Sequence, residues 1–496
     1  MSGATWMPSP EALNFRRGSV IGFLLILVLS ATAYIGLDRG ATAGWFTLLC
    51  YLPLVYLSIP LLLTKKIDPF QPVAWLMLCV ALGTSFKSTV MIYDTAPVVM
   101  INLMRGQELS FFLPAAIWIN VTCVCFLVGY LYKFGSASTP SLWLSGTIEN
   151  WNKKLLLLIG LTVVLLSVLS IWWFFQHPGV DPISRSNLSV KRLPLIGGKK
   201  FSYGLPRNLI ALANTVFLVG MTYWLSLKEH TWKQIIPLYL LTGFCLFFPL
   251  VSSSRINMAF IIFYLLMGYY YLRDLEWKRL LVPVAILLLI GNLLMFRSRL
   301  NIANQSSASP IELLYGLSAS MLHHSNGLGI SKTAIIMNDV PERVPFAYGS
   351  YVLSLLYAPI PKTTWPEKPP VLTGPVVAEK FYGYNWNESG GVPPGLTAEL
   401  YWNFGKAGIL VGSLLFGLLS GWVYRKFRSD LRNPNRFPLY LSFLYSVSFL
   451  MVWAGFNYAF LSLVRISLPV FLILLIINRF RIGEGLFSNK KISQNN

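Results

Sequence analysis

Charged residues are scarce in this chain of 496 residues: Asp, Glu, Lys and Arg make up 12% of it, whereas hydrophobic residues make up 55%. Length alone would suggest several soluble domains. Apolar runs long enough to cross a hydrocarbon core of about 30 Å recur along the sequence, however. The composition therefore excludes a set of soluble domains and predicts one polytopic membrane domain over residues 1–496.

Acidic residues are the rarer charged class, with 19 Asp and Glu against 40 Lys and Arg and a net charge of +21. Such an excess could indicate nucleic-acid binding. Most basic clusters, however, lie in short segments between apolar runs, as the positive-inside rule predicts for cytoplasmic loops. We therefore expect membrane lipids, and not nucleic acid, to be the partners of this charge.

Cysteine is also rare, and all five cysteines fall inside apolar runs. Cys123 and Cys125 are two residues apart on one predicted helix and cannot pair with each other. The sequence contains no disulfide framework, zinc spacing, Walker motif, Rossmann motif or internal repeat. The cysteines are interpreted as small packing residues.

The apolar runs predict an all-α protein with about twelve transmembrane helices. If the spans alternate in direction, the basic clusters fall on one side and both termini are cytoplasmic. The loops 176–207 and 298–406 then lie on the opposite side. The expected spans are 19–37, 44–64, 70–91, 111–132, 155–175, 208–226, 235–252, 256–272, 280–297, 407–424, 437–456 and 460–478.

Loop 176–207 departs from the charge rule, because it carries six basic residues, among them Arg185 and Arg192, against the single acid Asp181. A translocated loop usually avoids such an excess, so an anion is expected to compensate it. Two interpretations stay open, a phosphate-bearing ligand and anionic lipid of the outer leaflet.

Several basic residues lie near the outer ends of predicted spans. An arginine within a span costs about 2.5–3.5 kcal/mol on insertion scales and is a functional candidate by default. Snorkelling to the interface is the alternative for each of them, and it is the interpretation given to Lys87. The arginines concerned are Arg255, Arg297, Arg299 and Arg465.

Proline and aromatic residues concentrate in the segments 358–370 and 393–405 of the long loop. So much proline excludes a regular helix, and irregular backbone cannot face lipid. Trp365, Phe381 and Trp402 belong to an aromatic group that suits either stacking on sugar rings or an interfacial belt.

These segments carry a pattern of motifs. Ile360-Pro-Lys362 runs into Trp365-Pro-Glu-Lys-Pro369, and Glu399-Leu-Tyr-Trp-Asn-Phe-Gly405 opens a glycine-rich span. Ser252-Ser-Ser-Arg255 closes an earlier span. Together they resemble the oligosaccharide repeat-unit polymerases, the Wzy-type O-antigen polymerases.

The resemblance implies a GT-C-like fold in the bacterial inner membrane, with the large loop between helices 9 and 10 in the periplasm. It implies an inverting glycosyltransferase that polymerises undecaprenyl-pyrophosphate-linked oligosaccharides into O-antigen or another surface polysaccharide. A chain-length regulator protein is a further partner that it suggests.

The developing negative charge of this reaction lies on the leaving pyrophosphate, where cations lower the barrier. The sequence has no Asp-x-Asp to hold a metal ion. Arginine binds phosphate through bidentate donors, so we expect a site without metal or cofactor. Its predicted cations are the arginines named above, with Arg343 and Lys362 assisting.

The acceptor hydroxyl needs a base, for which Glu399 is preferred because it lies in the family-like motif just before a span. The pair His323 and His324 is the second choice, since histidine titrates near neutral pH. Glu399 could instead pair with a neighbouring cation, and the histidines could lie on a helix surface.

Two other functions remain open. An O-antigen ligase would share the donor but transfer the glycan to the lipid A core. A lipid-linked oligosaccharide flippase, or another transporter, would carry charges near the middle of its spans and paired hydrophobic repeats.

Overall fold

The computed structural model is almost entirely helical. It describes residues 10–63, 68–93, 108–133, 147–175, 195–196, 199–200, 204–227, 236–237, 240–246, 255–273, 328–360, 364–365, 367–383, 391–428 and 430–479. Within these ranges the only strands are β1 (Leu195–Ile196) and β2 (Lys199–Lys200), which pair antiparallel with Leu195 opposite Lys200.

Eight helical stretches are long and apolar enough to cross a membrane, which confirms a polytopic all-α membrane protein. Two shorter apolar helices, Leu212–Ser226 and Phe260–Leu272, coincide with further predicted spans. Span 235–252 is described only in pieces and span 280–297 lies outside the described residues, so the number twelve stays a prediction. The eight stretches are Ser19–Arg39, Ala41–Leu62, Pro72–Ile92, Leu109–Leu131, Lys153–Trp172, Leu396–Arg428, Phe437–Ala454 and Phe456–Arg479.

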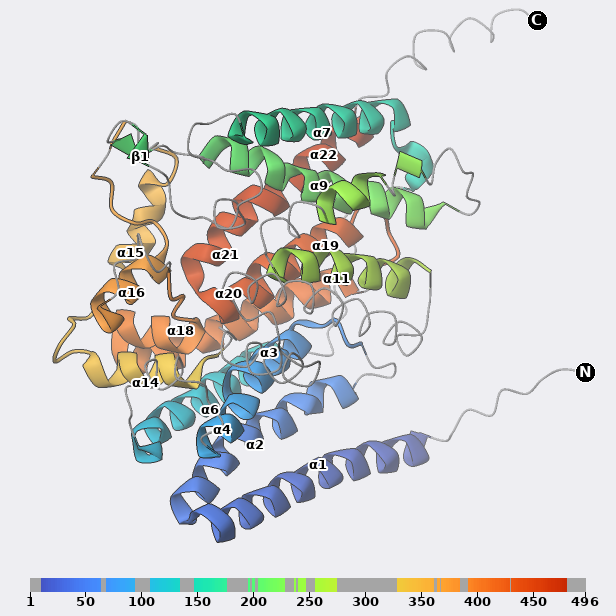
Figure 1. Cartoon of the computed structure of the whole chain (residues 1–496). Helices are drawn as coiled ribbons and strands as arrows, with labels where there is room; N and C mark the ends of the chain where they lie inside the picture. The colour runs from blue at the N-terminus through green and yellow to red at the C-terminus, as the bar shows by residue number, and fades with distance from the viewer. Residues whose placement is uncertain are drawn as a thin grey trace, which may run out of the picture.

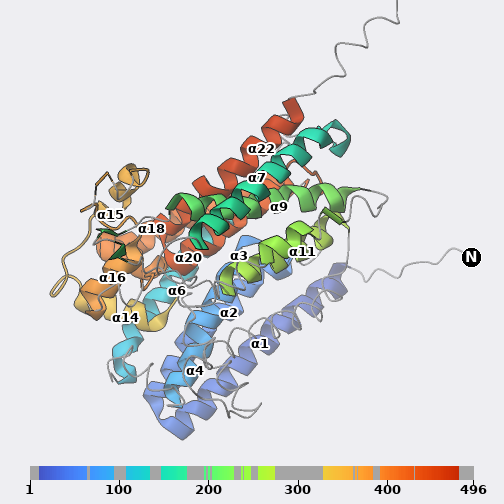
Figure 2. The ribbon, with the colours of Figure 1, turned by 45° about the horizontal axis from the view of Figure 1, so that its top comes forward.

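The helices form one bundle, with α1 at its edge against α2 (Figures 1 and 2). Several spans change pitch through π-helical turns. In chain order the bundle helices are α1 (Pro10–Arg39), α2 (Ala41–Leu63), α3 (Pro72–Val80), η1 (Ala81–Ser85), α4 (Phe86–Ile92), α6 (Leu109–Leu131), η3 (Ile148–Asn150), α7 (Lys153–Phe175), α9 (Gly204–Ser226), α11 (Arg255–Leu272), α18 (Leu396–Arg428), α19 (Phe437–Phe443), η6 (Leu444–Phe449), α20 (Leu450–Ala454), α21 (Phe456–Ser462), η7 (Leu463–Ser467) and α22 (Leu468–Arg479).

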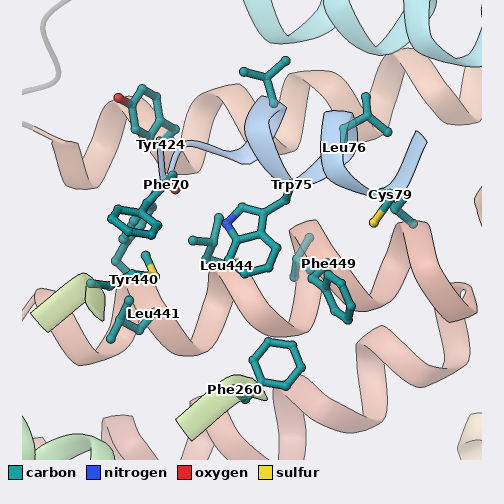
Figure 3. Close-up of a cluster of buried hydrophobic side chains, with 14 of the residues drawn as sticks. Phe70, Trp75, Leu76, Cys79, Phe260, Tyr424, Tyr440, Leu441, Leu444 and Phe449 are labelled. Atoms are coloured by element: carbon teal, nitrogen blue, oxygen red, sulfur yellow. The ribbon is translucent and has the colours of Figure 1, made fainter. Parts of the chain in front are cut away.

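Aromatic side chains fill the centre of the bundle, where α3, α11 and η6 meet (Figure 3). The Trp75 ring lies 4.7 Å from that of Phe263 and 5.6 Å from that of Phe449, and Phe260 packs on Phe449 at 5.2 Å. Aromatic pairs of this kind, two of them edge-on and one tilted, add about 0.5–1.5 kcal/mol per pair to the burial of their area. The described residues at the centre of the bundle therefore form a packed core.

Helices α6 and α18 approach each other at backbone distance. A Cβ on Gly417 would lie 2.1 Å from the carbonyl oxygen of Phe126, and one on Gly129 would lie 2.3 Å from that of Leu414. Small residues permit such close approach between membrane helices. The glycine-rich span recognised in the sequence is thus a packing surface.

The predicted role of the cysteines is confirmed for four of them. Cys50, Cys79, Cys123 and Cys245 are buried among apolar side chains, and Cys125 is partly buried.

Four elements gather at one end of the bundle, on the left of Figures 1 and 2. They are α14 (Ile330–Asp339), α15 (Ser350–Leu353) with η5 (Ser354–Tyr357), α16 (Thr373–Tyr382) and the first segment of α18 (Leu396–Asn403). These elements, together with the described residues that connect them, are called the cap here. The cap falls within the loop 298–406.

The first segment of α18 folds back on the rest of that helix. Phe404 and Gly405 have non-helical dihedral angles, and the Leu400 side chain lies where a Cβ on Gly412 would be. The membrane-crossing part of α18 therefore begins after this kink.

The cap has its own apolar core, and two of the aromatic residues considered for sugar stacking belong to it. Phe381 and Trp402 are fully buried, with their rings 5.3 Å apart. The interpretation of these two as exposed stacking or belt residues is therefore wrong, because they pack against Ile335, Ile336 and Val377. Trp365 does remain exposed.

Candidate functional site

Glu399 lies at the junction of the cap and the bundle. Its side chain is only 5% exposed. One carboxylate oxygen, Oε2, accepts a hydrogen bond of 2.5 Å from the backbone N–H of Phe456, the first residue of α21. The carboxylate thus lies at the N-terminus of the continuous helical stretch Phe456–Arg479.

Gly455 makes this contact possible. It forms the turn between two candidate spans and has φ +108° and ψ 179°, a conformation that is essentially restricted to glycine. A Cβ at this position would lie 2.2 Å from Oε2 of Glu399. Both the backbone angle and the space for the carboxylate therefore require glycine.

The next residue but one, Asn457, fixes the cap to the same turn. Its fully buried Nδ2 donates to the backbone oxygens of Tyr351 at 2.6 Å and Val371 at 2.7 Å. These acceptors come from two different segments of the cap. The turn between the last two spans is consequently the anchor on which the cap is assembled.

Asn403 holds the segment that carries Glu399. Its Nδ2 donates to the backbone oxygen of Glu399 at 2.8 Å, and its Oδ1 accepts from the backbone N–H of Gly349 at 2.9 Å. Trp402 Nε1 donates to the Pro345 oxygen at 3.3 Å. The residues of the family-like motif Glu399–Gly405 therefore position this acid from both sides.

The N-terminus of a helix stabilises a negative charge, by about 0.3–1 kcal/mol at exposed sites and up to about 2 kcal/mol where it is partly buried. In the observed arrangement Glu399 is a helix cap. The Phe456 N–H engages only Oε2, so the second carboxylate oxygen, Oε1, is the atom that could take a proton from a hydroxyl while the cap stays in place. The predicted pairing with a neighbouring cation is not seen among the described ion pairs.

Arg343 joins two parts of the cap. It forms an ion pair of 2.8 Å with the buried Asp339 and donates to the backbone oxygens of Lys380 and Phe381. Its side chain is about half exposed. These contacts are structural, and its predicted role beside a pyrophosphate stays a prediction.

The other predicted cations are only partly described. Arg465 lies exposed in the π-helical turn η7, and Arg255 is the first residue of α11. Their convergence on one cavity stays a prediction. The remaining predicted site residues, which lie outside the described residues, are Arg185, Arg192, Arg297, Arg299, His323, His324 and Lys362.

Two of the buried lysines lie in α4 and α14. Lys87 in α4 is 4% exposed and Lys332 in α14 is 5% exposed. Snorkelling of Lys87 to the interface is therefore wrong, because the residue is enclosed within the protein. Burial, with the positive charge of Lys87 as a second cause, lowers the pKa of Lys332 well below its usual 10.5.

Only one of these lysines carries a signal in the sequence. Lys87 stands out as a charge within a span, but nothing in its neighbouring sequence shows that the folded chain buries it. Lys332 lies in an amphipathic stretch of the loop and has no distinguishing feature. No group of three or more His, Cys, Asp or Glu side chains that could hold a metal ion occurs in the described ranges.

Comparisons with known proteins give no relative. No protein-family model, no curated protein and no solved structure matches this chain.

Proposed function

We propose that the protein polymerises polyprenyl-pyrophosphate-linked oligosaccharide repeat units at the periplasmic face of the bacterial inner membrane. In the reaction, a sugar hydroxyl of one lipid-linked unit attacks the anomeric carbon of the growing chain. The glycosidic bond forms as the bond to the lipid pyrophosphate breaks, with inversion and without a metal ion. The GT-C-like arrangement of about twelve spans is part of this proposal.

The burial of Glu399 is the observation that best supports this proposed function. An ionisable group enclosed beside membrane helices is costly and is a functional candidate by default. Glu399 lies in the motif that resembles the polymerases, and that motif builds its surroundings through Trp402 and Asn403. The proline-rich segment is part of the same cap, where Lys368 Nζ donates to the Ala358 and Ile360 oxygens at 2.9 and 2.7 Å.

In this proposal Glu399 accepts the proton of the acceptor hydroxyl. His323 or His324 is the alternative candidate for this base. Arginines bind the pyrophosphates of the two lipids, since they stay charged and bind phosphate in a bidentate manner. These arginines are Arg185, Arg192, Arg255, Arg297, Arg299 and Arg465, with Arg343 and Lys362 assisting.

The test is a deletion strain of the source organism complemented with the wild-type chain, Glu399→Gln or Glu379→Gln. Glutamine keeps an oxygen that accepts from Phe456 but cannot act as a base. A general base contributes about 10²–10⁴-fold to a rate, so Glu399→Gln should lose long chains at unchanged protein level in the membrane. Glu379 is exposed on α16 and should be replaceable without effect.

The deletion strain itself separates the alternatives. Single repeats on the lipid A core indicate a polymerase, whereas a core without any repeat indicates a ligase. Repeat units retained on the cytoplasmic leaflet indicate a flippase. Chains of normal length in the Glu399→Gln strain would remove Glu399 from the role of base.

A further inference from the structure

The helical segment formed by α15 and η5 turns its apolar side chains outward. Val352 and Leu353 are 36% and 62% exposed, and Leu356 is 81% exposed. Ser354, which lies between them in the chain, is buried, and its hydroxyl donates to the backbone oxygen of Val371 at 3.1 Å. A helix on a water-facing surface has the reverse arrangement, with its polar side chains outward. This segment therefore presents to its surroundings the kind of surface that other helices bury.

The exposed apolar surface continues on both sides of this segment. Tyr348 precedes it and is 73% exposed, and Trp365, which follows it and is 39% exposed, lies with its ring 5.5 Å from that of Tyr357 at the end of η5. The sequence 344–361 contains no charged residue. Exposed apolar surface of this kind marks an interaction site for a protein, a membrane or a ligand. It is called the apolar face of the cap and consists of Tyr348, Val352, Leu353, Leu356, Ile360 and Trp365.

The membrane-crossing part of α18 shows where the bilayer begins. Residues 407–424 carry no charge and extend over about 27 Å at 1.5 Å per residue, close to the thickness of a hydrocarbon core, about 30 Å. Val411, Leu415 and Trp422 are exposed along this length. Lys406 directly precedes it, with Nζ 5.9 Å from the centre of the Trp118 ring on α6. Tryptophan and lysine are typical of the membrane interface, so the boundary on the side of the cap lies near Lys406.

The apolar face of the cap begins at this boundary. Phe404, two residues before Lys406, is 54% exposed, and its ring lies 3.6 Å from where a Cβ on Gly349 would be. The backbone N–H of Tyr348 donates to the backbone oxygen of Asn403 at 3.2 Å. The start of α15 is thus fixed to the point at which α18 enters the membrane, and Phe404 connects the apolar face of the cap with the lipid-facing side of α18.

We propose that the apolar face of the cap lies in the interfacial layer of the bilayer and is covered by lipid. The rings of Tyr348 and Trp365 suit the level of the headgroups, where one side of an aromatic side chain is apolar and its polar atom is hydrated. Leu353 and Leu356 extend toward the acyl chains, as the apolar residues of interfacial helices do. A surface for a glycan would carry hydrogen-bonding side chains between its rings, whereas Ser354 is turned inward and bonded to the backbone of the cap.

This contact with lipid also sets the depth of Glu399. The side-chain amide of Asn457 donates to the backbone oxygen of Tyr351 in α15, and the neighbouring Phe456 donates to Glu399. A cap that is held at the interface therefore keeps the carboxylate near the level of the lipid headgroups. The inference does not depend on which reaction the protein catalyses.

The test measures the depth of single side chains in the full chain, placed in nanodiscs of phosphatidylcholine. Leu356→Cys is labelled with an environment-sensitive fluorophore, which is quenched either by phosphatidylcholine with a nitroxide on its acyl chain or by iodide in the water. Val411→Cys is the lipid-facing control, and Glu379→Cys, at an exposed position of α16, is the water-facing control. The wild-type chain, treated in the same way, gives the background from its own cysteines.

The nitroxide lipid should quench labelled Leu356→Cys nearly as strongly as Val411→Cys, and iodide should quench it at least about threefold less than Glu379→Cys. Leu353→Cys should give the same result, which controls for a local effect of the label. Quenching by iodide as in Glu379→Cys, with none by the nitroxide lipid, would place the face in water and overturn the inference. Protection from both quenchers would show that protein covers the face, either another segment or a second copy, and would overturn it as well.

Discussion

Replacement of Gly455 by alanine should detach the cap from the last two spans. Alanine is strained at φ +108° and ψ 179°, at about 1–3 kcal/mol. Its Cβ would also lie 2.2 Å from Oε2 of Glu399 and displace the carboxylate from Phe456. A buried polar group left without its partner costs about 1–3 kcal/mol. The sum predicts a loss of about 2–6 kcal/mol in the free energy of unfolding.

Gly383→Ala is the matched control. Gly383 also has a positive φ, +65°, but a Cβ there meets nothing within 4 Å. The free energy of unfolding of this variant should fall only by the backbone strain of a left-handed residue, about 1–2 kcal/mol. Both variants can be measured by titration with sodium dodecyl sulfate in mixed micelles, with tryptophan fluorescence as the signal.

The double variant Glu399→Ala with Gly455→Ala separates strain from contact. Once the carboxylate is absent, alanine at 455 should cost only its backbone strain, so the two changes should be less than additive by about 1–3 kcal/mol. If Gly455→Ala is no more destabilising than Gly383→Ala, or if the two changes are additive, the described contact between Glu399 and the turn is refuted.

Two further predictions concern the bundle. Gly417→Ala should destabilise the chain by at least about 1–3 kcal/mol in the same titration, because its Cβ would overlap backbone on α6. Gly22→Ala, which places a Cβ in open space, should be neutral or stabilising by up to about 1 kcal/mol. Equal effects of the two variants would contradict the close approach of α6 and α18. Asp68→Asn should cost about 1–3 kcal/mol, because its carboxylate accepts from the hydroxyls of Tyr271 at 2.6 Å and Tyr424 at 2.8 Å. Tyr424→Phe in the Asp68→Asn background should then lower the free energy of unfolding little further. A fully additive loss would show that the Tyr424 hydroxyl and the Asp68 carboxylate act separately.

The membrane spans could be predicted because their signal is local. Length and continuous hydrophobicity suffice to identify a helix that crosses a bilayer, and Leu109–Leu131 and Lys153–Phe175 begin and end within two residues of the prediction. Pro53 and Pro60 within α2 did not obscure that span, since other contacts in a bundle compensate for the lost hydrogen bonds.

Features that depend on distant segments could not be predicted. Glu399 was identified from its motif, but its partner Phe456 lies 57 residues away, beyond the rest of α18 and the whole span Phe437–Ala454. Trp402 looks like an exposed loop aromatic in the sequence because only the fold of the cap buries it. Lys87 looks like an interfacial lysine for the same reason, since only the folded bundle encloses it.

The purified chain in detergent, supplied with a synthetic polyprenyl-pyrophosphate repeat unit and EDTA, gives the most direct test of the proposed function. The repeat unit must carry the glycan of the source organism, and products are separated by gel electrophoresis. A ladder of products differing by one repeat unit is the predicted result and would establish a polymerase that needs no metal ion. Absence of a ladder, with product formed only after lipid A core is added, would contradict the account and indicate a ligase.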